Sequence, residues 1–315
     1  MDLKISIESL KESDLQQADF IMRFAFGTFL GMPDPLKFMG DANYVVTRWN
    51  ADRGSTFGAI VNNELSGSVF VSNWGSVGFF GPLTIHPKYW NQGLAQRLME
   101  PVLECFSNWK TKNTGLFTFA DSQKHINLYQ KFGFWPWYLT SIMTKFVAEN
   151  RAELQWSKLS DGKEGNMEEM ITECKLCTDA IYDGLEVSME IRSVAAQKLG
   201  ETILLWDEGK LAGLAICHCG QGTEAGSGNC YIKFGAVLPG HRAGKNFACL
   251  IEACENMAKE KDLTKLVAGV NTARQETYKI MLNNNFKVSR YGIAMQRPNE
   301  SDYNRPDSYI IDYWR

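Results

Sequence analysis

The stretch Gly81-Pro-Leu-Thr-Ile-His-Pro-Lys-Tyr-Trp-Asn-Gln-Gly-Leu-Ala-Gln-Arg-Leu-Met99 decides the fold. Residues 77–85 are apolar and aromatic and end at turn residues, which predicts a buried strand. Residues 86–93 predict a turn, because Pro87 cannot continue a strand and the closing glycine permits close backbone approach. From 95 to 110, apolar residues recur at helical spacing. A strand, a turn of small residues and a helix N-terminus together predict an anion-binding site.

A second motif lies downstream of the first. The first motif reads Ile85-His-Pro87 and then Trp90-Asn-Gln-Gly-Leu-Ala95, and the second reads Leu128-Tyr-Gln-Lys-Phe-Gly-Phe134. With these pieces the chain resembles the GNAT superfamily of acetyl-CoA-dependent N-acyltransferases. The signature of that family is Val/Ile-x-Pro, then Arg/Gln-x-x-Gly-x-Gly/Ala opening a helix, then a helix that ends Tyr-x-x-x-Gly-Phe. One position departs from it: Trp90 stands where the family has Arg or Gln.

The expected elements of residues 1–147 follow the order of this family, β-α-α-β-β-β-α-β-α-β. Hydrophobic periodicity and turn residues predict strands at 4–7, 55–61, 66–71, 77–85, 114–119 and 134–147, and helices at 14–30, 35–48, 95–110 and 122–132. The resemblance therefore implies a mixed α/β fold, with a GNAT domain over residues 1–147.

Residues 167–315 repeat the same plan after a polar, charged linker at 148–166, which contains a short candidate strand at 154–159. Pro87 and Pro239 are separated by 152 residues, and so are Phe134 and Phe286. This constant offset predicts two tandem GNAT folds. A glycine-rich loop at 220–229 has no counterpart of that length in the first half. The C-terminal tail, residues 306–315, is apolar enough to dock, either as an added strand or over the junction of the halves.

The resemblance also implies which residues of the first half act. Leu83, Thr84 and Ile85 would pair with the pantetheine of CoA. Tyr129 falls on the position of the general acid, and Ser122 falls where many members carry an Asn that touches CoA. The pyrophosphate would be held by the turn and the start of the helix, at Asn91, Gln92, Gly93, Leu94, Ala95, Gln96 and Arg97.

The second half departs from the family pattern at the matching positions. On the alignment through Pro239 the glycine position holds Lys245, and on the alignment through Phe286 the tyrosine position holds Met281. A thioether cannot donate a proton. We therefore expect the first half to be catalytic and the second to be degenerate, shaping the substrate cleft or supporting a homodimer. Activity in the second half is the alternative, and binding stoichiometry would decide it.

The general base and the acceptor remain open at this stage. His86, Asp121 and His125 lie near the motifs, and a chain of water molecules serves the same purpose in this fold. Four tryptophans near expected strand ends, Trp74, Trp90, Trp135 and Trp137, suggest an aromatic pocket, although packing in the core explains them equally well.

Composition narrows the functional class. The chain has 315 residues, 44% of them hydrophobic and 22% charged, which is globular and long enough for two domains. A net charge of −3 gives no reason to expect a nucleic-acid partner. No apolar run reaches the ~20 residues of a membrane span, and the N-terminus lacks the pattern of a signal peptide. We expect a cytoplasmic protein.

The eight cysteines favour a reducing compartment in which they pack as small core residues. The alternative is a zinc site built from Cys174 and Cys177 with Cys217 and Cys219. We expect no metal.

The predicted function is transfer of an acetyl group from acetyl-CoA to a primary amine of a small molecule or peptide. The alternative is a non-catalytic acyl-CoA-binding or interaction protein that kept the fold, which the departure at Trp90 favours.

Overall fold

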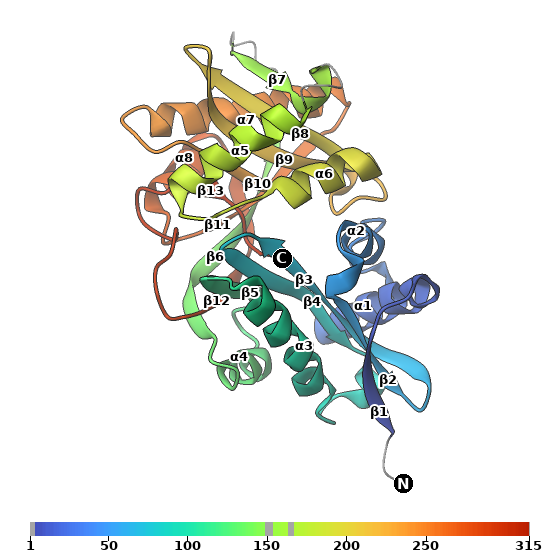
Figure 1. Ribbon diagram of the computed structural model, residues 1–315. Helices are drawn as coiled ribbons and strands as arrows, with labels where there is room; N and C mark the ends of the chain where they lie inside the picture. Colours follow the sequence, from blue (N-terminus) through green and yellow to red (C-terminus); the bar gives the residue numbers. More distant parts are fainter. Residues whose placement is uncertain (1–3, 149–153, 163–166, 315) are drawn as a thin grey trace.

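The computed structural model describes residues 4–148, 154–162 and 167–314. Within these ranges thirteen strands belong to one continuous mixed sheet, and the helices cover both of its faces. The N-terminal half lies below and the C-terminal half above, with the C-terminus between them (Figure 1). The sequence predicted this mixed α/β class.

The first half contains the expected elements in the expected order. They are β1 (Ile5–Ser9), α1 (Leu15–Phe29), α2 (Val45–Ala51), β2 (Thr56–Val61), β3 (Glu64–Trp74), β4 (Val77–Ile85), α3 (Leu94–Trp109), β5 (Asn113–Phe119), α4 (Gln123–Gln130) and β6 (Trp135–Phe146). The helix expected at 35–48 forms only in its last part. A 3-10 turn at Pro35–Lys37 ends where Met39 and Gly40 adopt left-handed backbone angles, and the α-helix α2 begins at Val45.

The second half repeats the plan. Its elements are β7 (Trp156–Lys158), α5 (Met167–Ile181), α6 (Ser188–Gln197), β8 (Gly200–Asp207), β9 (Lys210–Gly220), β10 (Gly226–Val237), α7 (Ala243–Glu260), β11 (Lys265–Asn271), α8 (Gln275–Asn283), β12 (Lys287–Arg297) and β13 (Ile310–Ile311). The expected loop at 220–229 shrinks to a turn, because β9 and β10 continue into it. The candidate strand of the linker is β7, which pairs with β8; residues 149–153 and 163–166 of the linker lie outside the described residues.

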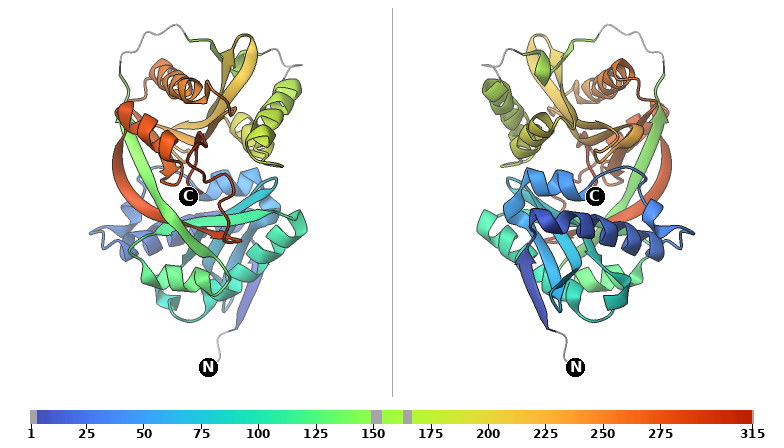
Figure 2. Two further views of the ribbon diagram at one scale, coloured as in Figure 1. Left: turned by 90° about the vertical axis from the view of Figure 1, so that its left-hand side faces the viewer. Right: turned by 90° about the vertical axis from the view of Figure 1, so that its right-hand side faces the viewer.

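Alternating side chains of β3 pack the two helical layers of the first half. Val69 and Val71 lie in a core with the apolar side of α3, including Leu98. Phe70, between them, points to the other face and packs with Met22 of α1. Successive residues of a strand face opposite sides of the sheet, so one strand serves both layers. Figure 2 shows the helices on either side of the lower sheet.

The two halves exchange their last long strands. β12 of the second half lies between β5 and β6, and β6 of the first half pairs with β11. Ala294 of β12 is opposite Phe117 of β5, and Thr144 of β6 is opposite Val267 of β11. β6 and β12 run side by side between the halves (Figure 2). The exchange could not be predicted from the sequence, because it leaves the order and length of the elements unchanged.

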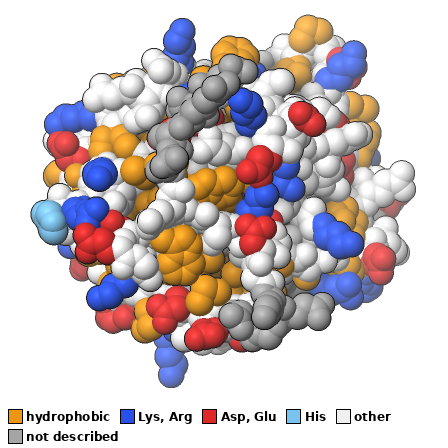
Figure 3. Space-filling view, turned by 90° about the horizontal axis from the view of Figure 1, so that it is seen from above, with side chains coloured by type: hydrophobic (Ala, Val, Ile, Leu, Met, Phe, Trp, Pro, Cys, Tyr) orange, Lys and Arg blue, Asp and Glu red, His pale blue; other side chains and the backbone are white. Residues whose placement is uncertain are grey.

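The surface of the second half carries mixed charge. Seen from above, acidic and basic side chains are interspersed among small apolar groups on the face that is drawn (Figure 3). Among the helices described in the structure, none has both the length and the apolar character that crossing a bilayer requires.

Candidate active site

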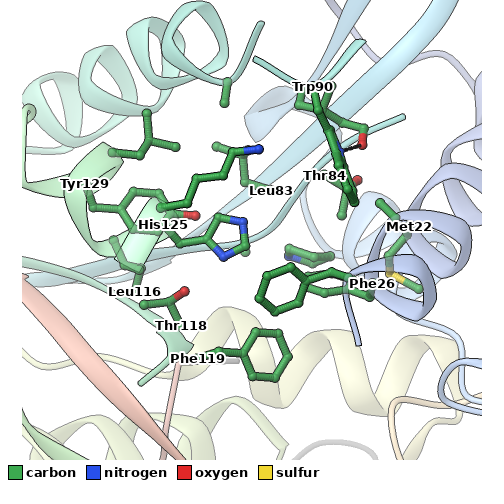
Figure 4. A pocket seen from close by; sticks show the side chains of 18 of the residues that line it. Met22, Phe26, Leu83, Thr84, Trp90, Leu116, Thr118, Phe119, His125 and Tyr129 are labelled. Carbon is green, nitrogen blue, oxygen red and sulfur yellow. Dashed lines mark hydrogen bonds between the residues drawn. The ribbon is translucent and has the colours of Figure 1, made fainter. Parts of the chain in front are cut away.

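A cavity of about 610 Å³ opens in the first half where β4 and β5 separate. The two strands run parallel and pair only from Val77 to Phe79, opposite Asn113 to Gly115, and then diverge. The cavity is bordered by α1, the far part of β4, the start of α3, β5 and α4 (Figure 4). A volume of this size is typical of a small-molecule or cofactor site.

The cavity brings together most of the residues that the sequence singled out. Ten of them line it: Leu83, Thr84, Ile85, Asn91, Gln92, Gly93, Leu94, Ala95, Gln96 and Tyr129. Arg97 and Ser122 do not. The guanidinium of Arg97 donates to the carbonyl of Ile5 at 3.4 Å. The hydroxyl of Ser122 is buried and lies 2.8 Å from Nδ1 of His125.

The turn before α3 has the backbone that its glycine predicts. Gly93 has a φ of 81° and precedes the first residue of the helix, and Asn91 is also left-handed at 64°. A Cβ on Gly93 would meet nothing within 4 Å, so the glycine is required for its backbone angle and leaves open space in front of the helix. Free amides at such a helix start favour an anion.

Trp90 fastens this turn to the strand before it. Its indole Nε1 donates to the carbonyl of Ile85 at 2.7 Å, and the ammonium of Lys124 lies 5.1 Å from the centre of its ring. The departure from the family pattern therefore has a structural role, and Lys124 supplies a positive charge beside the turn.

A bulge in β4 directs its far end away from β5. Opposite β3, Leu83 pairs with Val69, but Phe80 pairs with Val71, so the register shifts at Gly81 and Pro82. Bulges of this kind bend a strand and frequently lie next to active sites. The buried guanidinium of Arg48 donates to the carbonyl of Gly81 and holds the bulge in place.

Tyr129 and His125 are one helical turn apart on α4 and face the cavity (Figure 4). The ring of Tyr129 meets Phe80 edge-on with centroids 5.6 Å apart, and its burial raises the pKa of its hydroxyl. Burial, assisted by the nearby charge of Lys124, lowers the pKa of His125 below 6.5. A neutral imidazole beside a protonated phenol is a suitable pair for moving protons in opposite directions.

The comparisons with known proteins agree with this geometry. Residues 27–134 match the model of the acetyltransferase (GNAT) family. These residues form a GNAT acetyltransferase domain. Members of that family transfer an acyl group from an acyl-CoA, so the protein is an acyltransferase. No curated protein sequence matches the chain.

Solved structures extend the GNAT fold over both halves. A putative acetyltransferase from Pyrococcus horikoshii has a TM-score of 0.67 at 12% identity, over 99% of this chain and 95% of that one. A GCN5-related N-acetyltransferase from Sphaerobacter thermophilus has a TM-score of 0.59 at 12% sequence identity, over 93% of this chain and 95% of that one. A tandem GNAT protein from the clavulanic acid biosynthesis pathway, in a structure without acetyl-CoA, has a TM-score of 0.57 at 9% sequence identity, over 94% of this chain and 98% of that one. At these identities the likeness establishes the tandem fold alone.

An aromatic wall lines one side of the GNAT cavity, but it is not the wall that the tryptophans suggested. The rings of Phe29 and Phe119 stack with centroids 5.4 Å apart, and Phe29 lies 5.0 Å from His125. Of the four tryptophans, only Trp90 lines the cavity. Trp74 is buried between the halves, against Phe79 and Phe234. The helical spacing of the phenylalanines in α1 predicts that they share one face of the helix. It does not predict that this face lines a cavity.

The second GNAT-like half has the same gap, and the C-terminal tail fills it. β10 and β11 pair only from Asn229 to Tyr231, three residues as in the first half. Past that point β13 pairs with β10 at Gly235 and Ala236. At the offset of 152, these residues correspond to Leu83 and Thr84. The chain's own tail thus occupies the strand edge that stays open in the first half.

The remaining predicted groups of the second half are engaged in packing. Met281 is fully buried. The hydroxyl of Tyr278 lies 3.0 Å from that of Tyr291. Burial raises the pKa of the Cys174 and Cys177 thiols to about 12, as expected of core cysteines. Among the described residues, no group of three or more His, Cys, Asp or Glu side chains is placed to hold a metal ion.

Proposed function

We propose that this protein transfers the acetyl group of acetyl-CoA to a primary amine of a small molecule or peptide, in the cavity of the first half. One observation carries the proposal. The open edge of β4, the left-handed turn before α3 and the buried Tyr129 all border the same cavity.

The proposed binding of acetyl-CoA follows the backbone. Beyond Phe79, β4 no longer pairs with β5, so the backbone at Leu83, Thr84 and Ile85 can bond to the amides of pantetheine. The turn at 91–96 and the start of α3 can hold the pyrophosphate, with Lys124 beside it. Arg97 and Ser122 then support the site without lining it.

The proposed chemistry is direct attack. The amine nitrogen bonds to the thioester carbon, and a backbone amide at the divergence of β4 and β5 stabilises the oxyanion. His125 accepts the proton that the amine loses. When the carbon–sulfur bond breaks, the Tyr129 hydroxyl protonates the departing thiolate. The Ser122 hydroxyl, 2.8 Å from Nδ1, leaves Nε2 of His125 available to the cavity.

The test is Tyr129→Phe. Loss of the proton donor should lower turnover by 10² to 10⁴, the usual share of a general acid, while CoA still binds. The measurement is thiol release on a panel of amines together with calorimetric titration of CoA. Turnover equal to that of the parent protein would exclude Tyr129 as the acid.

We further propose that residues 1–147 contain the only catalytic site and that residues 167–315, after the linker at 148–166, form a degenerate copy. The β13 pairing at Gly235 and Ala236, and the burial of Met281 at the tyrosine position, support this division of roles.

A second candidate function is binding of acyl-CoA without catalysis, which Trp90 favours because it replaces the phosphate-binding side chain of the family. Thermal shift with CoA and slow hydrolysis of acetyl-CoA separate the two candidates. Stabilisation by CoA with no hydrolysis and no transfer to any amine would favour binding alone.

A further inference from the structure

The charged side chains that line the cavity are all basic. They are Lys124, Lys131 and Arg290, and the described lining residues include neither Asp nor Glu. A site for an acceptor with several positive charges would need carboxylates to balance them. This cavity instead favours an acceptor that brings a negative charge.

Arg290 is the basic residue at the aromatic wall. It lies on β12, so the second half delivers it into the cavity of the first through the strand exchange. Its guanidinium carbon lies 5.3 Å from the ring centre of Phe119. A second lining cation, Lys124, lies over the ring of Trp90, beside the turn proposed for the pyrophosphate. The two cations thus belong to different parts of the cavity.

The wall connects Arg290 to His125 through two aromatic rings. Phe119 stacks on Phe29, and Phe29 lies against His125. Phe26 meets Phe119 edge-on at 6.1 Å and adds to the same apolar surface. An acceptor that places its amine at His125 would lay its body along these rings, with its far end at the guanidinium.

We propose that the acceptor is an amine that carries a carboxylate at the opposite end of an apolar, preferably aromatic, body, and that Arg290 determines this specificity. The inference rests on the proposed function. A guanidinium binds a carboxylate through two parallel hydrogen bonds, and its stacking on Phe119 orients the fork. Arg290 is a specificity residue and takes no part in moving protons.

The test compares three probes that differ at one end: 4-(aminomethyl)benzoate, its carboxamide, and benzylamine. We expect the acid to be acetylated at least about tenfold faster in kcat/KM than the amide, the factor for ~1.4 kcal/mol. Arg290→Gln should bring that ratio close to one, and Arg290→Lys should keep part of it because the charge remains but the fork is lost. Lys287→Gln, an exposed cation on the same strand, serves as the control and should keep the ratio of the parent.

Binding measured without chemistry keeps this inference separate from the proposed function. Calorimetric titration of each probe into the CoA complex reports recognition even where no transfer occurs, while hydrolysis and thermal shift with CoA report the co-substrate site. The inference is overturned if the acid binds no better than the amide, or if neither binds. It is also overturned if Arg290→Gln weakens CoA and leaves the preference for the acid unchanged, since Arg290 would then serve the phosphates.

Discussion

Arg48 and Glu224 form a buried, two-pronged ion pair between the halves, with Nε to Oε1 at 3.0 Å and Nη2 to Oε2 at 2.9 Å. The same guanidinium donates to the carbonyl of Gly81 in the β4 bulge. Nζ of Lys233 lies 3.0 Å from Oε1 of Glu224 and 2.7 Å from Oε1 of Glu190. The pair is thus part of a buried network in which basic and acidic side chains alternate. The turn between β9 and β10 therefore supports the strand that borders the cavity.

Glu224→Gln should destabilise the protein strongly. It leaves Arg48 and Lys233 buried without full compensation, a loss of about 3–5 kcal/mol in the free energy of unfolding. Urea denaturation measures it. Glu208→Gln is the control, because Glu208 pairs with Arg242 at an exposed site and should change stability by less than about 1 kcal/mol. Equal effects of the two variants would contradict a structural role for the buried pair.

Stability should fall in acid because of the same network. Burial alone would raise the pKa of Glu190, but Lys233 and His218 outweigh it and lower that pKa to about 2. The pKa of Glu224 is also lowered, against its burial, by Arg48 and Lys233. A carboxylate whose pKa is lower in the folded state stabilises the protein above its unfolded pKa, near 4.5, and that stability disappears as pH falls toward 2.

Urea denaturation at several values between pH 5 and pH 3 checks this dependence. Each such carboxylate adds up to about 1.4 kcal/mol per pH unit to the slope. Glu190→Gln should lower the slope of unfolding free energy against pH by the contribution of about one proton. A slope identical to that of the parent protein would show that Glu190 does not titrate with folding.

The rate of transfer should depend on the protonation of His125. Its pKa is lowered, first by burial and then by Lys124, so the neutral base predominates above about pH 6.5. We expect kcat, measured at saturating amine, to rise with pH through an inflection below 6.5. His125→Gln should remove that inflection and lower the rate by about 10² or more. An unchanged inflection in the variant would assign it to another group.

CoA should bind once per chain, in front of α3. Gly93→Trp fills the open space at the turn and forces a side chain onto a left-handed backbone, so CoA binding should be lost. Gly240→Trp is the matched control in the second half, where a Cβ also meets nothing within 4 Å. Titration calorimetry should give a stoichiometry of one for the parent and the control. Retained binding in Gly93→Trp would place the site in the second half.

The sequence was sufficient to predict most of the local secondary structure and the strand, turn and helix start that border the cavity. The apolar run before Pro87 and the glycine at 93 predicted the strand, the turn and the helix, because those features depend on neighbouring residues. Tyr129 was singled out by the resemblance of residues 128–134 to the GNAT motif, and it lines the cavity. The helix expected at 35–48 begins only at Val45, because left-handed residues at Met39 and Gly40 interrupt the pattern before it.

Contacts between distant residues could not be predicted. The Arg48–Glu224 pair joins residues 176 apart in the chain, and no local pattern marks either one as buried. Arg290 reaches the cavity only because β12 lies between β5 and β6. The occupation of the second gap by β13 likewise depends on where the tail returns. In each case the information lies in the tertiary arrangement and not in a periodicity.

The two halves should unfold together. β5 finds its neighbour in β12 and β11 finds its neighbour in β6, so loss of either half removes a strand from the other. Differential scanning calorimetry should give one transition whose calorimetric and van't Hoff enthalpies agree. Two resolved transitions would contradict this coupling.

The exchange of β6 and β12 also bears on whether the first half could exist without the second. Here deletion of the second copy would leave the first without the strand beside β5 and without Arg290. The second half is thus structurally necessary to the first site whether or not it carries a reaction of its own, and substitutions more than 150 positions away from the Gly93 motif can alter that site.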